Sequence, residues 1–188
     1  MLRVVAGRFR GRKLDTLPGK DVRPTAERVR EAIFNKLVHG LLVVGGAPLT
    51  GVRVLDAFAG TGALGFEALS RGADHVTFIE NDAASARLIE RNAGHLGVAA
   101  SVAVLRRDAT APGPCRAPVD LVLMDAPYRA ELSRPAVEAL RTAGWLAEAA
   151  LVVVELGRDE AFDPPDGFET VDDRRYGAAR VIFLRRAA

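Results

Sequence analysis

From residue 52 onward, short runs of consecutive apolar residues alternate with longer stretches in which apolar residues recur at helical spacing. The runs, which predict strands, cover residues 52–56, 75–80, 101–106, 119–124 and 151–155. The stretches between them, which predict helices, cover residues 63–71, 83–96 and 132–143. Strands that are apolar at nearly every position are buried on both faces, so the pattern predicts an α/β fold with a mostly parallel sheet covered by helices on both sides.

The two ends of the chain follow a different pattern. Residues 168–172 and 180–184 are strand-like with no helical stretch between them, which predicts an antiparallel hairpin that closes the sheet. Residues 2–17 predict a second, basic hairpin of two short strands. A helix then follows Pro24, with Thr25 as its N-cap, and runs to His39.

A glycine- and proline-containing break at residues 45–48 interrupts the pattern between this helix and the sheet. We therefore expect an N-terminal extension over residues 1–45 and the main domain over residues 46–188.

Composition narrows the class of protein. The chain has 188 residues and is 49% hydrophobic, enough for one globular domain with a short appendage. A single cysteine, Cys115, forms no internal disulfide, and the three histidines lack metal-ligand spacing, so we expect a cytoplasmic protein without a bound metal. No apolar segment is long enough to span a membrane, and no surplus apolar stripe suggests an oligomer, so we expect a soluble monomer.

Charge is distributed unevenly along the chain. The net charge is +2, but residues 1–30 hold nine Lys and Arg against three acidic residues, a local balance of +6 that leaves −4 for the rest. A basic arm on a mildly acidic body favours a polyanionic partner such as nucleic acid, although a solvated surface would have the same composition.

The first motif with chemical content is residues 56–62, Asp-Ala-Phe-Ala-Gly-Thr-Gly, directly after a predicted strand. Ligands of such sheets bind at the carboxyl ends of the strands, where strand order reverses. Gly60 and Gly62 allow a tight turn and a close ligand approach. Glu80 ends the next strand, where it can accept hydrogen bonds from both hydroxyls of a ribose, and Asp108 follows the third at the height of an adenine.

A dinucleotide site is the rival interpretation, because residues 60–65 match G-x-G-x-x-G and Glu80 lies about twenty residues on. That fingerprint begins directly after its strand, whereas four residues intervene here. The carboxylate of Asp56 would repel a pyrophosphate but suits the cationic amino-acid end of S-adenosylmethionine. The residues therefore favour a methyl donor.

The second motif, Asp125-Ala126-Pro127-Tyr128, also follows a predicted strand. An amino group conjugated to a ring is a poor nucleophile, and it needs hydrogen-bond acceptors that localise its lone pair. Asp125 and the carbonyl of Ala126 can supply them, Pro127 stiffens the turn, and Tyr128 offers a stacking face for a base. The motif is typical of enzymes that methylate amino or amide nitrogens, without choosing among them.

Residues 3–7, 11–14, 23–35, 56–65, 125–128 and 175–177 together resemble the bacterial RsmD-type guanine-N2 methyltransferases of 16S ribosomal RNA. The resemblance implies a Rossmann-like class I methyltransferase fold with an N-terminal extension, S-adenosylmethionine as methyl donor, and a guanine of the small (30S) ribosomal subunit as acceptor. Ala126 stands where that family usually has a first proline, but the main-chain carbonyl is retained, so we expect activity to survive.

On this resemblance we assign three sets of candidate residues. The catalytic set is Asp125, Ala126, Pro127 and Tyr128. The S-adenosylmethionine set is Asp56, Phe58, Gly60, Gly62, Glu80, Asn81, Asp108 and Ala109. The RNA-binding set is Arg8, Arg10, Arg12, Lys13, Arg23, Thr25 and Arg28. An adenine-N6 DNA methyltransferase and a non-catalytic ribosome assembly factor that binds the donor remain alternatives.

Overall fold

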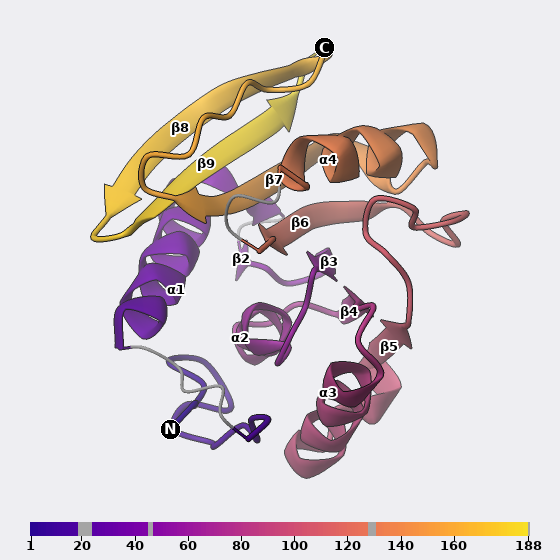
Figure 1. Cartoon of the computed structure of the whole chain (residues 1–188). Helices are drawn as coiled ribbons and strands as arrows, with labels where there is room; N and C mark the ends of the chain where they lie inside the picture. The colour runs from indigo at the N-terminus through magenta and orange to yellow at the C-terminus, as the bar shows by residue number, and fades with distance from the viewer. Residues whose placement is uncertain (19–23, 45–46, 128–130, 188) are drawn as a thin grey trace.

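The structure, a computed structural model, describes residues 1–18, 24–44, 47–127 and 131–187, and its centre is a seven-stranded sheet (Figure 1). The strand order is β5-β4-β3-β6-β7-β9-β8. Strands β5, β4, β3, β6 and β7 are parallel, whereas β9 runs antiparallel to both β7 and β8. The parallel sheet and the closing C-terminal hairpin are therefore as the sequence predicts.

The predicted strands and helices of the main domain are all present. The strands are β3 (Arg53–Ala57), β4 (His75–Ile79), β5 (Val102–Leu105), β6 (Val119–Asp125), β7 (Leu146–Gly157), β8 (Phe168–Tyr176) and β9 (Ala179–Arg186). The helices are α2 (Ala63–Ser70), α3 (Ala83–Leu96) and α4 (Ser133–Thr142), with a 3₁₀ turn at Ala99–Ser101. Strands β8 and β9 are longer than expected, because charged residues at their ends obscure the apolar pattern. Strand β7 is also longer, because it begins in the alanine-rich residues 146–150, which give no strand signal.

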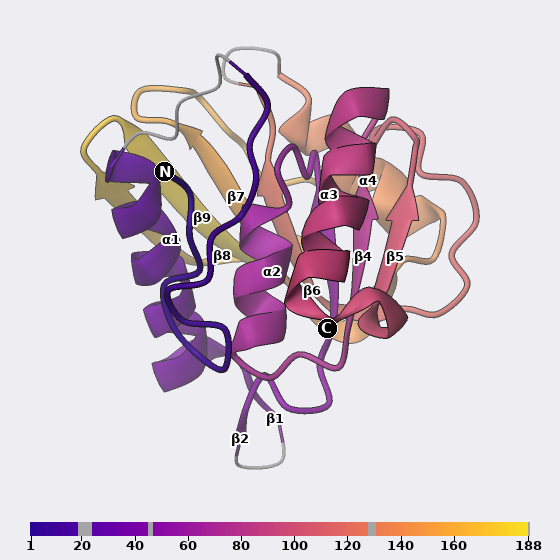
Figure 2. The same ribbon diagram turned by 90° about the horizontal axis from the view of Figure 1, so that it is seen from below.

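Helices cover both faces of the sheet, which gives the molecule three layers and two apolar cores. The first core packs α1 (Pro24–Lys36), α2 and α3 against one face of the sheet, and Figure 2 shows these helices side by side in front of it. The second core packs α4 and Trp145 against the other face. The continuous apolar character of the strands is explained by this burial on both sides.

Strand β3 lies at the switch point of the sheet. It pairs with β4 on one side and with β6 on the other. Strands β4 and β5 extend the sheet outward on the first side, and β6 and β7 extend it on the second. The carboxyl ends of β3 and β6 therefore border the crevice in which ligands of this kind of sheet bind.

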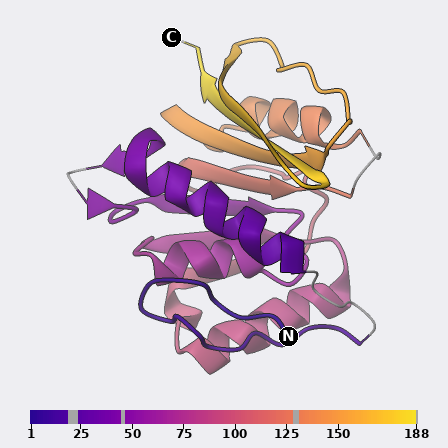
Figure 3. The same cartoon turned by 90° about the vertical axis from the view of Figure 1, so that its left-hand side faces the viewer.

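The predicted N-terminal hairpin forms only in part. Leu14 N donates to Leu2 O over 3.0 Å and Val4 N donates to Arg12 O over 3.0 Å, but the pairing is a single bridge, Arg3 with Lys13, and not two strands. The segment lies across α2 and near α3, and does not extend the sheet (Figures 2 and 3). Side chains of α2 and α3 accept hydrogen bonds from backbone amides of the segment, and those amides are then not available for pairing between two longer strands.

The helix after this segment also differs from the prediction. It begins at Pro24, a favourable first helical residue, so Thr25 lies inside the first turn and is not the N-cap. It ends at Lys36 and continues as one π-helical stretch, Leu37–Leu41. Two unpredicted short strands, β1 (Val43–Val44) and β2 (Ala47–Pro48), follow. The proposed domain boundary at residues 45 and 46 lies outside the described residues and stays a prediction.

Candidate active site

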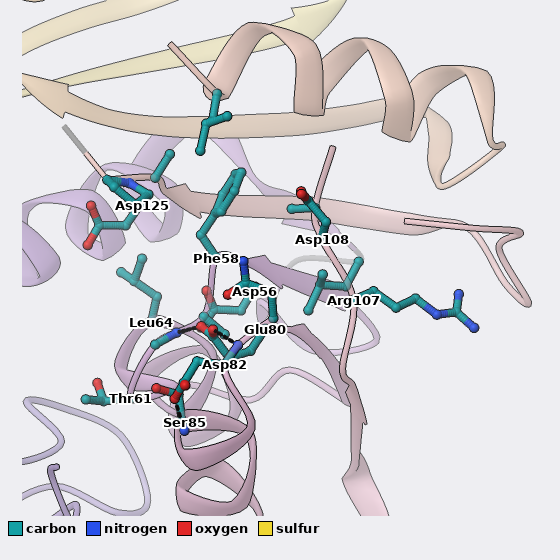
Figure 4. A pocket seen from close by; sticks show the side chains of 18 of the residues that line it. Asp56, Phe58, Thr61, Leu64, Glu80, Asp82, Ser85, Arg107, Asp108 and Asp125 are labelled. Carbon is teal, nitrogen blue, oxygen red and sulfur yellow. Dashed lines mark hydrogen bonds between the residues drawn. The ribbon is translucent and has the colours of Figure 1, made fainter. Parts of the chain in front are cut away.

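A pocket of about 600 Å³ opens at the carboxyl ends of β3, β4, β5, β6 and β7. Its volume is within the range of small-molecule sites. The following predicted residues line it: Asp56, Phe58, Gly60, Glu80, Asn81, Asp108, Ala109, Asp125, Ala126 and Pro127. Figure 4 shows Asp108 and Asp125 on opposite sides of this pocket, with Phe58 between them. The structure thus brings the predicted donor and acceptor motifs together in one cavity.

The loop after β3 has an unusual backbone. Phe58, Gly60 and Gly62 all have positive φ, of 60°, 54° and 77°. This region is unfavourable for a residue with a side chain, and such strain is concentrated at functional sites. Gly62 does not line the pocket but precedes α2, and a Cβ there would lie 2.8 Å from the ring of Phe66. Its predicted contact with a ligand stays a prediction.

Asp56 lies at the base of the pocket and is 1% exposed. Its Oδ2 accepts a hydrogen bond from Gly65 N over 2.8 Å, in the first turn of α2. Burial raises the pKa of Asp56 well above its usual value, this hydrogen bond opposes the rise, and the charges of Asp125 and Glu80 add to it. The ionised form of Asp56 would therefore be stabilised by a cation bound in the pocket.

Glu80 joins two loops at the donor side of the pocket. Its Oε2 accepts from Gly60 N over 2.6 Å, and its Oε1 accepts from Asp82 N over 2.8 Å. Asp82 in turn caps α3, because its Oδ2 accepts from Ser85 N over 2.7 Å. Each Glu80 oxygen retains a second lone pair. A ribose would therefore meet a carboxylate that the backbone already holds in place.

Asp108 lies on the side of the pocket opposite Asp125 and is held by its own loop. Its Oδ1 accepts from Thr110 N over 2.8 Å and from Thr110 Oγ1 over 2.7 Å, and these bonds lower the pKa of Asp108. The neighbouring guanidinium of Arg107 points away from the pocket, where it donates to Pro112 O over 2.6 Å (Figure 4).

The pocket is strongly acidic. Among the described residues that line it, the acidic ones outnumber the single basic residue, Arg107, by six to one. They are Asp56, Glu80, Asp82, Asp108, Asp125 and Glu155. A cavity with this charge distribution favours a cationic ligand and disfavours a pyrophosphate.

Asp125, Ala126 and Pro127 border the pocket at the end of β6. Asp125 is an exposed residue at the mouth of the pocket, and the pocket wall covers its side chain only in part. This partial burial raises the pKa of Asp125 to about 6. Ala126 is buried and its carbonyl remains a predicted acceptor. Tyr128, the predicted stacking residue, lies outside the described residues.

The predicted RNA-binding side chains are partly accessible. Arg8, Arg10, Arg12, Lys13 and Arg28 are exposed, whereas Arg23 lies outside the described residues and Thr25 is described only as backbone. Arg8 lies over the ring of Phe9 at 4.5 Å, and Arg12 donates to His95 O over 2.7 Å.

Two other basic residues of this arm have internal partners. Arg3 pairs with Glu27 at 3.2 Å, and Arg30 is buried. The basic surface is therefore smaller than the count of charges implies.

Sequence reasoning missed several residues of the pocket. Glu155 and Asp82 line it, as do the apolar side chains of Leu64 and Leu132. An acidic residue at the end of an apolar strand is the signal that identified Asp56, and Glu155 carries the same signal. The apolar residues lie on ordinary amphipathic stretches and give no such signal.

Comparison with known sequences gives a consistent match. The family described as Conserved hypothetical protein 95 matches residues 2–185. The ribosomal RNA small subunit methyltransferase D of Haemophilus influenzae is 33% identical over 180 residues, covering 94% of this chain and 89% of that protein. The Escherichia coli protein of the same name is 37% identical over 155 residues, covering 82% and 74%.

Comparison with solved structures agrees. One from Escherichia coli is 31% identical and has a TM-score of 0.82, covering 100% of this chain and 98% of that chain. The magnesium protoporphyrin IX methyltransferase of Synechocystis is 17% identical with a TM-score of 0.66, covering 93% and 87%, and shares the fold alone. The predicted class I methyltransferase fold is confirmed.

Proposed function

Since this chain belongs to the family described as Conserved hypothetical protein 95, as its resemblance to the RsmD type predicts, we propose that it methylates 16S ribosomal RNA. The methyl donor is S-adenosylmethionine, and the acceptor is the exocyclic N2 of one guanine. The protein acts as a cytoplasmic monomer on an assembled or assembling 30S subunit. The observation that carries the proposal is the acidic pocket that joins the two motifs at the switch point of the sheet.

The residues of the pocket fit the proposed donor. S-adenosylmethionine carries a sulfonium and an ammonium group, and it supplies an electrophilic methyl group that leaves its sulfur as the neutral thioether forms. The buried carboxylate of Asp56, whose ionised form is costly without a nearby cation, suits the ammonium end. Glu80 suits the ribose hydroxyls, and Asp108 with Ala109 suits the adenine.

The acceptor side supplies positioning and a base. Asp125 and the carbonyl of Ala126 accept hydrogen bonds from the guanine amine, which localises its lone pair toward the methyl group. After the N–C bond forms, the amine must lose a proton, and Asp125 is placed to accept it. A carboxylate with its pKa raised to about 6 is a better base near neutral pH than an ordinary one. The target base reaches the pocket by leaving its stack.

The exposed basic residues of the N-terminal segment serve RNA binding. Arg8, Arg10, Arg12, Lys13 and Arg28 hold phosphates and orient the RNA without reading its sequence, and Arg23 and Thr25 belong to the same set.

Tritium transfer from labelled S-adenosylmethionine to small subunits that lack the modification tests the proposal. We expect label on a guanine N2, and a loss of at least about 100-fold in Asp125→Ala, because a positioned base and acceptor is removed. Donor binding by the variant, measured by calorimetry, should change by less than a few-fold.

Two comparisons make the experiment decisive. Protein-free 16S RNA reports whether the assembled subunit is required, and duplex DNA tests for adenine methylation. Label on DNA alone would replace the guanine assignment by adenine. Donor binding with no label on any substrate would replace the enzyme by a non-catalytic assembly factor.

A further inference from the structure

Glu155 ends β7 directly beside Asp125. The two residues are register partners in the parallel pair β6 and β7, and both line the pocket. Adjacent strands are separated by about 4.8 Å, so the two side chains start from neighbouring points of the sheet edge. Glu155 is half-buried and belongs to neither predicted motif.

The two carboxylates also project from the same face of the sheet. Side chains alternate along a strand, so residues two apart share a face. Leu123 on β6 and Val153 on β7 both belong to the core beneath α1, α2 and α3. Asp125 and Glu155, each two residues further on, therefore project toward that same side. The acceptor end of the pocket thus presents two carboxylates next to each other.

Neighbouring carboxylates select among the substrates that the acceptor motif leaves open. On its Watson–Crick edge guanine offers two adjacent donors, N1–H and the N2 amine. Adenine offers the N6 amine beside N1, which is an acceptor, and a glutamine amide offers its NH₂ beside an oxygen. Two acceptors match the guanine edge, whereas the second carboxylate would face a lone pair on either alternative.

We propose that Glu155 is a specificity-determining residue that accepts the N1–H of the guanine whose N2 amine is held by Asp125. This inference rests on the proposed function, and it assigns the choice of base to a residue outside both motifs. Phosphate contacts position an RNA but do not read its bases, so a base-reading group is needed in the pocket.

Glu155 has other interactions, and they are compatible with this role. Its charge acts on the buried guanidinium of Arg30, whose Nη2 also donates to Arg3 O over 2.9 Å. An ionised carboxylate has about four lone-pair sites on two oxygens. Glu155 can therefore interact with Arg30 and still accept a hydrogen bond from a base.

The test compares two bases in two proteins. Once the labelled guanine is mapped, subunits are assembled with RNA in which that position is guanine or 2-aminopurine, made by ligating synthetic fragments. 2-Aminopurine keeps the 2-amino group but has an unprotonated N1. We expect the wild-type protein to prefer guanine by at least about 100-fold in kcat/KM, because a site built to bind a donor rejects an analogue without it.

The variant Glu155→Gln should then reduce this preference by about 10-fold or more, because an amide can accept from guanine N1–H or donate to the N1 of 2-aminopurine. Comparing this ratio between the wild-type and variant proteins cancels any difference in the intrinsic reactivity of the two bases. Glu148→Gln is the matched control, because Glu148 is exposed near the other end of β7. It should keep the wild-type ratio.

The outcomes separate the two proposals. If the wild-type protein labels no guanine, the proposed function fails and the inference fails with it. If guanine is labelled but Glu155→Gln keeps the wild-type preference, or loses activity equally on both bases, Glu155 has only a structural role and the inference alone is overturned. Thermal unfolding and donor binding of the variant, both expected near wild type, exclude misfolding as the cause.

Discussion

At the scale of single residues, Asp125, the proposed base, also destabilises the folded state when it is ionised. Burial raises its pKa to about 6, against about 3.9 in an unfolded chain. Between these values the native protein binds more protons than the unfolded one, so stability falls as pH rises from about 4 to about 6. Above that range the ionised carboxylate remains destabilising.

Replacing this carboxylate should therefore stabilise the protein at neutral pH. We expect Asp125→Asn to raise Tm by about a degree at pH 7.5, because solvent at the pocket mouth screens part of the effect. This gain should be nearly lost by pH 4, where the native side chain is protonated and the unfolded one is about half protonated. Calorimetric scans from pH 4 to 8 measure it. Asp166→Asn, at an exposed position, is the control and should show no such pH dependence. An equal Tm gain at both pH values would contradict the raised pKa.

At the scale of elements, the N-terminal segment is fastened to two helices by buried polar side chains. Glu67 of α2 is fully buried and accepts from Val5 N over 2.8 Å and from Ala6 N over 3.0 Å. Asn92 of α3 accepts from Asp15 N over 2.8 Å. A Cβ on Gly7 would lie 1.9 Å from Ser70 O, so the close approach of this segment to α2 requires glycine.

Removing the charge of Glu67 should release this segment. The carboxylate also pairs with the half-buried Arg71 at 2.8 Å and with the buried Arg30 at 3.7 Å, so Glu67→Gln leaves a buried cation without this counter-charge. We expect a loss of about 3 kcal/mol in the free energy of unfolding. Hydrogen exchange at the Val5 and Ala6 amides should accelerate.

Urea unfolding and amide exchange measure the two effects of Glu67→Gln. Glu90→Gln, exposed on α3, should leave both unchanged. Unchanged exchange at Val5 and Ala6 in the Glu67 variant would show that contacts other than those of the Glu67 carboxylate hold the segment.

The contrast between Asp56 and Glu67 shows which parts of the fold and of the pocket could be predicted from the sequence. Asp56, Glu80 and Asp125 follow apolar runs, and parallel strands bring such ends together, so the pocket could be predicted from local pattern. Glu67 and Asn92 are polar residues within amphipathic helices, and their partners are backbone amides 61 to 77 residues away. No local pattern encodes such partners, so the partial hairpin could not be foreseen.

At the scale of the whole molecule, charge separates into an acidic pocket and a basic N-terminal surface. The pocket favours a cationic small molecule, whereas the exposed arginines favour a polyanion. No helix among the described residues is long and apolar enough to cross a membrane. Because the acidic residues and the basic residues lie in different parts of the molecule, the two charged regions can be tested separately.

The salt dependence of RNA binding tests the basic surface. We expect the double variant Arg8→Gln and Arg10→Gln to weaken binding to 16S RNA and to reduce the slope of log K against log salt by about 0.9 for each duplex phosphate that the variant no longer neutralises. Fluorescence anisotropy between 50 and 300 mM KCl measures it. The same exchange at Arg134 and Arg141, exposed on α4, should keep the slope. Equal slopes in both double variants would place the RNA on another surface.

The fastening of the N-terminal segment to α2 and α3 also has a consequence during synthesis. Residues 2–15 leave the ribosome before their partners Glu67 and Asn92, which follow about 60 to 80 residues later. At about 5 to 20 residues per second the segment waits roughly 3 to 15 s for them. During this interval the segment lacks the partners that hold it in the folded protein, so it is fixed in place only after α2 and α3 have been made.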